Sequence, residues 1–353
     1  MKISKFDYTL PKSLIANTPA LPRDHSKLLI LNRNSGEIEH KHFYDIVDYL
    51  DENDVLVFNN TKVFPARLIG KKDTGGKVEL LLLETMDKKN NIWKAIYKGK
   101  IALKTIVYFN SLNGTIIEID NGIALVQFAK DYDETLKDID IIGHTPLPPY
   151  ITNLDTENNL RKKYQTVYAK EKGSAAAPTA GFHFTDHLLT MLKEKGIRME
   201  FITLHVGLGT FTPVKSESLE EHKMHSEYYE IDESVAKSLN KAKEEGKRII
   251  AVGTTTVRTL ESSLDKNNNL IPQKTKTNIF IYPPHKFKFT DCLITNFHLP
   301  KSTLLALVSA FVSKPNTNNT FINFQKSIVG KAYFEAIKSK YSFYSFGDAM
   351  FIQ

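Results

Sequence analysis

Apolar runs without polar alternation near the start of the chain predict buried strands. Residues 27–32 (KLLILN) and 54–60 (DVLVFNN) are such runs, and residues 43–50 (FYDIVDYL) between them carry apolar side chains at helical spacing. Strands that are apolar at every position suit a sheet that is covered on both faces. The first 60 residues are therefore expected to form a strand, a helix and a strand of an α/β protein.

Short β-rich segments follow from about Arg67, with no helical period among them. Six strands are expected, at residues 66–72, 77–85, 91–99, 105–109, 115–120 and 123–129. The turns between them include Gly75-Gly76, Asn113-Gly114 and Asn121-Gly122, and such dipeptides supply the positive φ angles of tight hairpins. The pattern predicts a small β-barrel that ends near the prolines of residues 143–151 (GHTPLPPYI).

Alternation of helices and strands returns after residue 151. Thr185 is expected to cap a helix that ends before Gly196, and Asp232 opens another that ends before Gly246. The remaining strands are expected at residues 197–206, 247–253, 278–282, 292–297 and 346–352, and the remaining helices at 254–264, 302–312 and about 321–337.

The alternation of strands and helices at both ends of the chain, with a run of short strands between them, predicts a discontinuous α/β domain that is interrupted by a small β-barrel domain. The α/β domain is expected to comprise residues 1–62 and 150–353, and the inserted barrel domain residues 63–149. A cleft between two such bodies is a natural place for a functional site.

Composition and charge narrow the class of protein. The 353 residues include 47 basic and 40 acidic side chains, a net charge of +7, which favours a polyanionic partner such as nucleic acid. A solvated lysine-rich surface would look the same. The longest apolar run, at residues 304–312, falls well short of the roughly 20 residues of a membrane span, so no membrane partner is expected. An amino terminus without an apolar signal segment and a single cysteine, Cys292, favour a cytoplasmic location.

One loop after a predicted strand is a candidate binding site. Residues 251–262 (AVGTTTVRTLES) run from a strand through Gly253 and three threonines into a helix, which directs free N–H groups and the hydroxyls of Thr254 and Thr255 at a ligand. Alternatively, one threonine caps the helix and the others fill space. Arg258 and Glu261 share one helical face, so they could bind a ligand or form an ion pair.

Three histidines are candidates for proton transfer. His183, His205 and His298 each lie beside glycine or proline near an apolar strand, and imidazole is the side chain best suited to proton transfer near neutral pH. A buried histidine that only satisfies its hydrogen bonds is the alternative for each.

Metal binding and hydrolase chemistry find less support. The spacings of His183 with His187 and of His222 with His225 could place two imidazoles on one face, but no HExxH motif accompanies them, so no metal is expected. Ser174 is not within a Gly-x-Ser-x-Gly turn.

Seven sequence blocks, spread from the first ten residues to the last ten, carry a family resemblance. The chain resembles the S-adenosylmethionine:tRNA ribosyltransferase-isomerases of queuosine biosynthesis. The blocks are FDYTLPKSLIA (6–16), DVLVFNNTKVFPARL (54–68), YQTVYAKEKGSAAAPTAGFHFT (164–185), TLHVGLGTFTPV (203–214), AVGTTTVRTLES (251–262), TNFHLPKSTLLALVSAF (295–311) and FGDAMFI (346–352). The resemblance implies an α/β domain with an inserted β-barrel, and a monomer.

The resemblance also implies a reaction. Members of this family transfer the ribosyl part of S-adenosylmethionine to 7-aminomethyl-7-deazaguanine at the wobble position of certain tRNAs, forming epoxyqueuosine and releasing adenine and methionine. S-adenosylmethionine is thus consumed as a co-substrate. Such a reaction needs a base for the proton beside the sulfonium, and a proton or charge for the departing adenine.

Site residues follow as expectations from residue chemistry and block position. His183 and His298 are expected to transfer protons, with His205 as a further candidate. Within residues 173–185 (GSAAAPTAGFHFT), small side chains would let the backbone approach a planar base, and the phenylalanines would either stack on it or enter the core. The substrate contacts expected here and at the threonine loop are Gly181, Phe182, Phe184, Gly253, Thr254, Thr255, Arg258 and Glu261.

A tRNA partner would account for the net positive charge of the chain. An anticodon loop presents bases outside a duplex, so an enzyme takes one into a pocket at low cost. Arg67, Arg161, Lys162 and Lys163 are candidate phosphate contacts. Two other functions stay open on the residues alone: a noncatalytic RNA-binding protein that uses the barrel, and a nucleotide hydrolase that uses the threonine loop.

Overall fold

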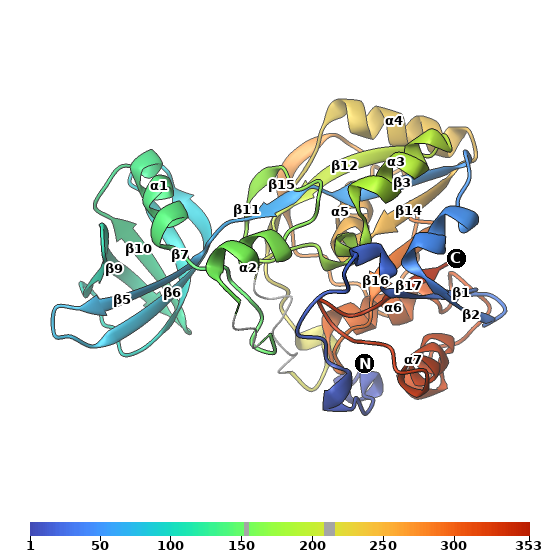
Figure 1. Ribbon diagram of the computed structural model, residues 1–353, viewed down its shortest axis with the longest axis horizontal. Helices are drawn as coiled ribbons and strands as arrows, with labels where there is room; N and C mark the ends of the chain where they lie inside the picture. Colours follow the sequence, from blue (N-terminus) through green and yellow to red (C-terminus); the bar gives the residue numbers. More distant parts are fainter. Residues whose placement is uncertain (152–154, 208–215) are drawn as a thin grey trace.

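The protein consists of an α/β body and a separate β-barrel that lies beside it, as a computed structural model shows (Figure 1). The structure describes residues 1–151, 155–207 and 216–353. Most of the sequence block at residues 203–214 therefore lies outside the described residues.

A nine-stranded mixed sheet forms the centre of the α/β body. Its strand order is β15-β13-β12-β3-β14-β16-β17-β1-β2. Strands β12, β3, β14 and β16 are parallel, whereas β17 runs antiparallel to β16. In sheet order the bounds are Gln273–Thr277, Glu227–Ile231, Arg198–Leu204, Asp54–Asn59, Arg248–Val252, Cys292–Asn296, Ala349–Ile352, Lys27–Leu31 and Ile38–His42.

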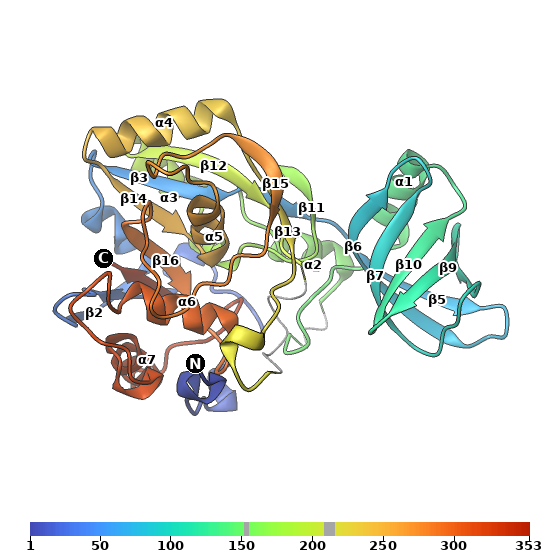
Figure 2. The same ribbon diagram turned by 180° about the vertical axis from the view of Figure 1, so that it is seen from behind.

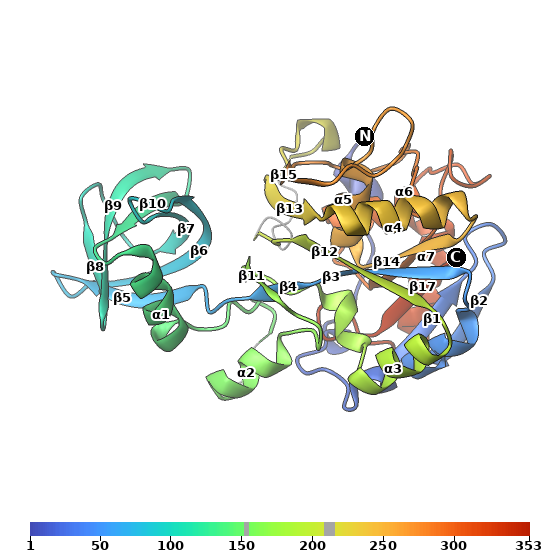
Figure 3. The same cartoon turned by 90° about the horizontal axis from the view of Figure 1, so that it is seen from above.

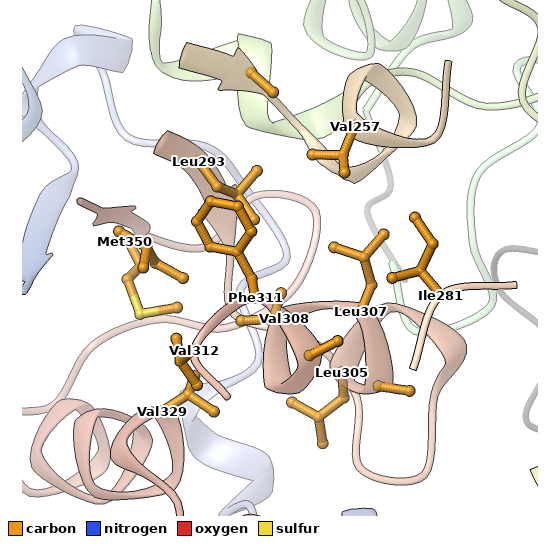
Figure 4. Packing of buried hydrophobic residues seen from close by; sticks show 14 of the residues in the cluster. Val257, Ile281, Leu293, Leu305, Leu307, Val308, Phe311, Val312, Val329 and Met350 are labelled. Carbon is orange, nitrogen blue, oxygen red and sulfur yellow. The ribbon is translucent and has the colours of Figure 1, made fainter. Parts of the chain in front are cut away.

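Alternate residues of the central strands pack into two different cores. Val55 and Val57 of β3 belong to a core with four helices, and Leu56 and Phe58 belong to a core on the opposite face. The four helices are α4 (Glu233–Glu244), α5 (Thr254–Ser262), α6 (Thr303–Phe311) and α7 (Ile328–Lys338), and Figure 2 looks onto the face that they cover. Figure 4 shows side chains of this core, which include Leu293 of β16 and Phe311 of α6. The opposite face is covered by α3 (Asp186–Glu194) and the 3₁₀ helix η4 (Phe43–Tyr49). Because both faces are covered, every residue of β3 is buried, as its continuous apolar pattern predicts.

The inserted barrel is closed, with strand order β10-β7-β6-β5-β8-β9. Its strands are β5 (Arg67–Lys72), β6 (Lys77–Asp87), β7 (Ile92–Lys98), β8 (Ile106–Phe109), β9 (Leu112–Asp120) and β10 (Ile123–Phe128). All six match predicted segments, so the predicted fold class is confirmed. The helix α1 (Tyr132–Ile142) packs Ile139 into the barrel core.

Short elements connect the barrel to the α/β body (Figures 1 and 3). Strand β4 (Thr61–Val63) follows β3 and pairs in parallel with β11 (Glu171–Ser174). The helix α2 (Glu157–Lys163) lies near this connection, and the 3₁₀ helix η5 (Thr179–His183) follows β11. Within the described ranges, no helix is both long and apolar enough to cross a membrane.

Four local expectations were wrong. The helix α1 was missed, although Asp131 caps it by accepting from the N–H of Glu134. Residues 278–282 form no strand; the strand lies just before them, in β15, whose residues pair with β13. Asn113-Gly114 lies inside β9, where Gly114 packs against Val126 and Phe128; the turn is at residues 110–111, and Asn110 has φ 56°. The helix at residues 43–50 is a 3₁₀ helix.

Candidate active site

A cavity opens in the α/β body where β14 and β16 end. The carboxyl ends of parallel strands are the usual ligand-binding edge of such sheets. The wall combines small side chains, hydroxyls, one amide, one imidazole and two tyrosines. It is lined by Tyr150, Ala177, Pro178, Thr179, Ala180, Val206, Gly253, Thr254, Thr255, Thr295, Asn296, Phe297, His298, Leu299, Ser302, Leu304, Tyr344 and Ser345.

The predicted threonine loop forms one side of this cavity. Gly253 has φ +92°, a conformation that L side chains rarely adopt, and it leads directly from β14 into α5. Thr254 and Thr255 open the helix and line the cavity, and Nδ2 of Asn59 donates to Oγ1 of Thr255 over 3.2 Å. The first N–H groups of α5 therefore face a space that can hold a polar ligand.

His298, which follows β16, also lines the cavity. Its Nε2 lies 2.8 Å from Oγ1 of Thr295, and no hydrogen bond of Nδ1 is recorded among the described residues. Two tyrosines hold its backbone: Tyr8 donates to the carbonyl oxygen, and the His298 N–H donates to Oη of Tyr333 over 2.9 Å. Burial of the ring lowers the pKa of His298 to about 3, so the imidazole is neutral at pH 7.

His183 lies below the cavity rather than in its wall. The ring is 3% exposed and stacks on Phe43, with 5.0 Å between the centroids. Its Nδ1 lies 2.7 Å from Oγ of Ser26, and Nδ2 of Asn296 donates to its Nε2 over 3.1 Å. Burial, and to a smaller extent the charge of Arg23, lower the pKa of His183 to about 3. His183 therefore reaches the cavity only through Asn296, which lines it.

Some residues of the stretch at 173–185 line the cavity, and others are buried in the hydrophobic core. Ala177 and Ala180 lie in the cavity wall, as small side chains at a ligand would. Neither phenylalanine is there: Phe182 stacks on Phe346 with Arg23 over its ring, and Phe184 packs in the core. The other predicted substrate contact of this stretch, Gly181, packs against Tyr168, because an added Cβ would lie 1.9 Å from the phenol oxygen.

His205 lines a second, larger cleft between the barrel and the α/β body. Its Nδ1 lies 2.8 Å from Oγ1 of Thr61, and its ring stacks on Tyr228. Its Nε2 faces Gly173, where an added Cβ would lie 2.5 Å away. Burial lowers the pKa of His205 to about 4, although the charge of Glu230 opposes the shift. The three predicted imidazoles thus do not share one cavity.

The second cleft combines apolar and basic side chains. The barrel contributes Phe64, Trp93 and Tyr132, and both bodies contribute lysines, namely Lys88, Lys94, Lys172 and Lys276. Two ion pairs span the two bodies: Lys276 of β15 with Glu84 of β6 over 2.6 Å, and Lys172 of β11 with Asp140 of α1 over 2.7 Å. Aromatic rings next to lysines are typical of surfaces that bind single-stranded nucleic acid.

Arg258 and Glu261 are engaged elsewhere and lie outside the cavity wall. Arg258 forms a buried ion pair with Glu227, which lines the second cleft. The Glu261 carboxylate accepts the backbone N–H groups of residues 288–290. The Arg258–Glu261 ion pair that the helical spacing allowed does not form; each side chain has another partner.

Three of the four predicted phosphate contacts hold the protein together. Arg161 binds the carboxylate of Glu157 and the carbonyl oxygens of Asp140 and Gly143. Arg67 donates to the carbonyl oxygen of Leu147, and Lys163 pairs with Asp155. Lys162 is exposed. The lysines of the second cleft were not predicted.

Several residues of the cavity wall were also missed. Thr295 and Asn296 lie three and two residues before the predicted His298, at the end of a predicted strand, and that position alone could have identified them. Tyr150 and Tyr344 come from segments distant in the sequence, and Thr179 lies within the predicted stretch at residues 173–185 but was not named. Of the part of the chain that the structure describes, no group of three or more His, Cys, Asp or Glu side chains is placed to hold a metal ion.

Comparison with known proteins decides the family. The model of the family described as "Queuosine biosynthesis protein" matches residues 3–352. The chain belongs to this family. The "S-adenosylmethionine:tRNA ribosyltransferase-isomerase" of Staphylococcus haemolyticus (strain JCSC1435) is 50% identical over 360 residues, which cover all of both chains. A crystal structure of the S-adenosylmethionine tRNA ribosyltransferase of Thermotoga maritima, 35% identical, covers 99% of this chain and 100% of its own, with a TM-score of 0.54. The queuosine biosynthesis family resemblance of the seven sequence blocks is thereby confirmed.

Proposed function

We propose that the cavity at the ends of β14 and β16 binds S-adenosylmethionine and is the catalytic site of a tRNA ribosyltransferase-isomerase. The chain is a member of the queuosine biosynthesis family and carries this activity. In the proposed reaction, the ribosyl part of S-adenosylmethionine is transferred to 7-aminomethyl-7-deazaguanine at the wobble position of tRNA and isomerised to epoxyqueuosine, with release of adenine and methionine. Family membership thus favours the transferase over an RNA-binding protein or a nucleotide hydrolase.

The observation that carries this placement is an imidazole nitrogen of His298 that has no hydrogen-bond partner among the described residues, in the wall of the cavity where β14 and β16 end. A neutral ring with one nitrogen at Thr295 has the other available to accept or donate a proton at the ligand. The proton next to the sulfonium is the group that a base must remove, and N–H groups and hydroxyls at the start of α5 suit the polar atoms of a nucleoside or an amino acid. His298 is therefore our first candidate for proton transfer.

The tRNA fits the second cleft better than the first cavity. An RNA loop needs an open groove with cations for its phosphates, and the cleft supplies lysines from both bodies beside aromatic rings. His205 lies in this cleft, and its neighbour Val206 lines the first cavity. In the proposed arrangement the deazaguanine enters along His205 toward the sulfonium. A monomer and a cytoplasmic location stay predictions from the sequence.

Release of adenine from S-adenosylmethionine tests this function. We expect purified protein to release adenine only with tRNA that carries the aminomethyl-deazaguanine precursor, and His298→Ala to reduce the rate at least 100-fold, the usual contribution of a proton-transferring side chain. Release without tRNA would indicate a hydrolase, and no release with the precursor tRNA would indicate an RNA-binding protein. Undiminished release by His298→Ala would remove this histidine from the mechanism.

A further inference from the structure

Asn296 carries the only side-chain amide in the described part of the cavity wall. It is the last residue of β16 and is 3% exposed. Its Nδ2 donates to Nε2 of His183 over 3.1 Å, and its Oδ1 accepts from Oγ1 of Thr179 over 2.9 Å. Each polar atom of the amide thus has one partner inside the protein.

Among the described residues, these two bonds leave the amide half satisfied. A side-chain amide has two N–H donors and two acceptor lone pairs, so one donor and one lone pair of Asn296 remain. Exchanging the amide oxygen and nitrogen would leave the same pair. A buried polar group without a partner costs free energy, and a ligand in the cavity can supply both missing partners.

A donor and a lone pair on one amide group are the pair that the edge of a purine requires. Adenine presents its 6-amino donor beside the acceptor N7 on one edge and beside the acceptor N1 on another, and an amide binds such an edge with two hydrogen bonds. The deazaguanine base of the tRNA also presents a donor beside an acceptor. Because the Asn296 cavity is within the α/β body, whereas an RNA base arrives through the lysine-lined cleft, adenine is the better match.

We propose that Asn296 recognises the adenine of S-adenosylmethionine through its 6-amino group and the adjacent ring nitrogen, and that His183 is the positioning residue that holds the amide. The inference rests on the proposed function of the cavity. His183 is suited to this role because Ser26 holds its other nitrogen and Phe43 holds its ring plane. A neutral imidazole keeps an acceptor at Nε2, so the amide cannot rotate without losing a buried hydrogen bond.

Binding of S-adenosylhomocysteine, measured by calorimetry without tRNA, tests the inference. It keeps the adenine and lacks the sulfonium, and its analogue without the 6-amino group lacks the donor on both edges. Loss of one neutral hydrogen bond should weaken binding to the wild-type protein about 10-fold. In Asn296→Leu, the ratio of the two dissociation constants should fall to about 1.

A matched control and a second pair of variants separate recognition from folding. Asn240 also uses one N–H and one lone pair, both with the backbone of Leu270 outside the cavity, so Asn240→Leu should keep the ratio. His183→Gln retains an acceptor and should keep most of the ratio, whereas His183→Leu should lose it. Thermal unfolding identifies any variant that fails to fold.

The outcomes are distinguishable. A wild-type protein that does not bind S-adenosylhomocysteine would overturn the placement of the co-substrate, and this inference with it. If Asn296→Leu binds S-adenosylhomocysteine with the wild-type ratio, only the inference is overturned. Weaker binding of free 7-aminomethyl-7-deazaguanine by the same variant, with an unchanged ratio, would overturn it as well and assign Asn296 to the base of the tRNA.

Discussion

Burial lowers the pKa of His183 and His298 to about 3 and that of His205 to about 4, from an ordinary value of 6.5. All three rings are therefore neutral at pH 7, and each has one nitrogen next to a hydroxyl, of Ser26, Thr295 or Thr61. A neutral imidazole both donates and accepts, which suits a site where a carbon-bound proton leaves and adenine is protonated.

The buried histidines predict an acid-sensitive fold. Because the folded-state pKa of His183 lies below its unfolded value, the unfolded chain takes up the proton first, and stability that is present above pH 6.5 is lost as the pH falls toward 3. Between pH 7 and 5, His183 should contribute a loss on the order of 2 kcal/mol of unfolding free energy. Urea unfolding at both pH values should show a smaller loss in His183→Gln. Equal losses in the two proteins would contradict this origin.

The contact of Gly173 with His205 predicts a position that tolerates no side chain. A Cβ at residue 173 would lie 2.5 Å from Nε2 of His205, so Gly173→Ala should displace the imidazole that lines the second cleft. We expect at least a 10-fold slower tRNA-dependent release of adenine, and also a lower thermal stability, because residue 173 has φ +154°, which L side chains rarely adopt. Gly76→Ala, on a barrel turn where the nearest atom is the flexible end of Lys72, is the control. If Gly173→Ala released adenine at the wild-type rate, the position of the His205 imidazole would not matter for the reaction.

At the scale of elements, the N-terminal segment and α7 fix the loop between β16 and α6. Tyr8 follows the 3₁₀ helix η1 (Ile3–Phe6), and Tyr333 belongs to α7; their phenols hold the carbonyl and the N–H of His298. Tyr8 belongs to the sequence block at residues 6–16, whereas Tyr333 lies outside the seven blocks.

Removal of the Tyr333 hydroxyl should make the loop between β16 and α6, which carries His298, more mobile, while the aromatic ring still fills its place in the core. Tyr333→Phe leaves the His298 N–H without its partner, which should cost about 1–3 kcal/mol of stability and slow adenine release about 10-fold. Tyr341→Phe is the matched control, because its phenol contacts His40 and the carbonyl oxygen of Leu28, outside the cavity wall. Equal rates in both variants would show that the bond to Tyr333 does not position His298.

For the whole molecule, the position of the barrel creates the larger cleft. The ion pairs Lys276–Glu84 and Lys172–Asp140 span the barrel and the body, but their side chains are partly exposed to solvent, so each contributes little to stability. The same lysines are available to phosphates when tRNA competes with the carboxylates. The cleft therefore combines a weak protein contact with an RNA surface.

Affinity for tRNA should fall steeply as salt is added. Lysines that contact phosphates release counterions on binding, so Lys88→Ala or Lys172→Ala should reduce the slope of log affinity against log salt by roughly 0.7 each. Lys266→Ala, an exposed lysine outside the cleft, should leave the slope unchanged. Equilibrium binding of precursor tRNA across a series of salt concentrations measures this slope. An affinity that does not change with salt would contradict the assignment of the cleft as the tRNA surface.

The sequence by itself determined the elements and the family. Apolar runs gave β1, β3, β14 and β16, hairpin dipeptides and alternation gave the barrel, and Thr185 and Gly196 bounded α3, because these signals are local in the chain. Helix α1 and strand β15 were missed, since the packing that stabilises them is with distant residues.

Only the tertiary structure decided which candidate residues meet. His183 and His298 look alike in sequence, yet one lies below the cavity and the other in its wall, because β16 places Asn296 between His183 and the space. The partners of Arg258 and Arg161, and the lysines of the cleft, likewise depend on segments brought together by the sheet and the barrel. Side-chain direction and burial are properties of the packed chain, and a linear pattern does not contain them.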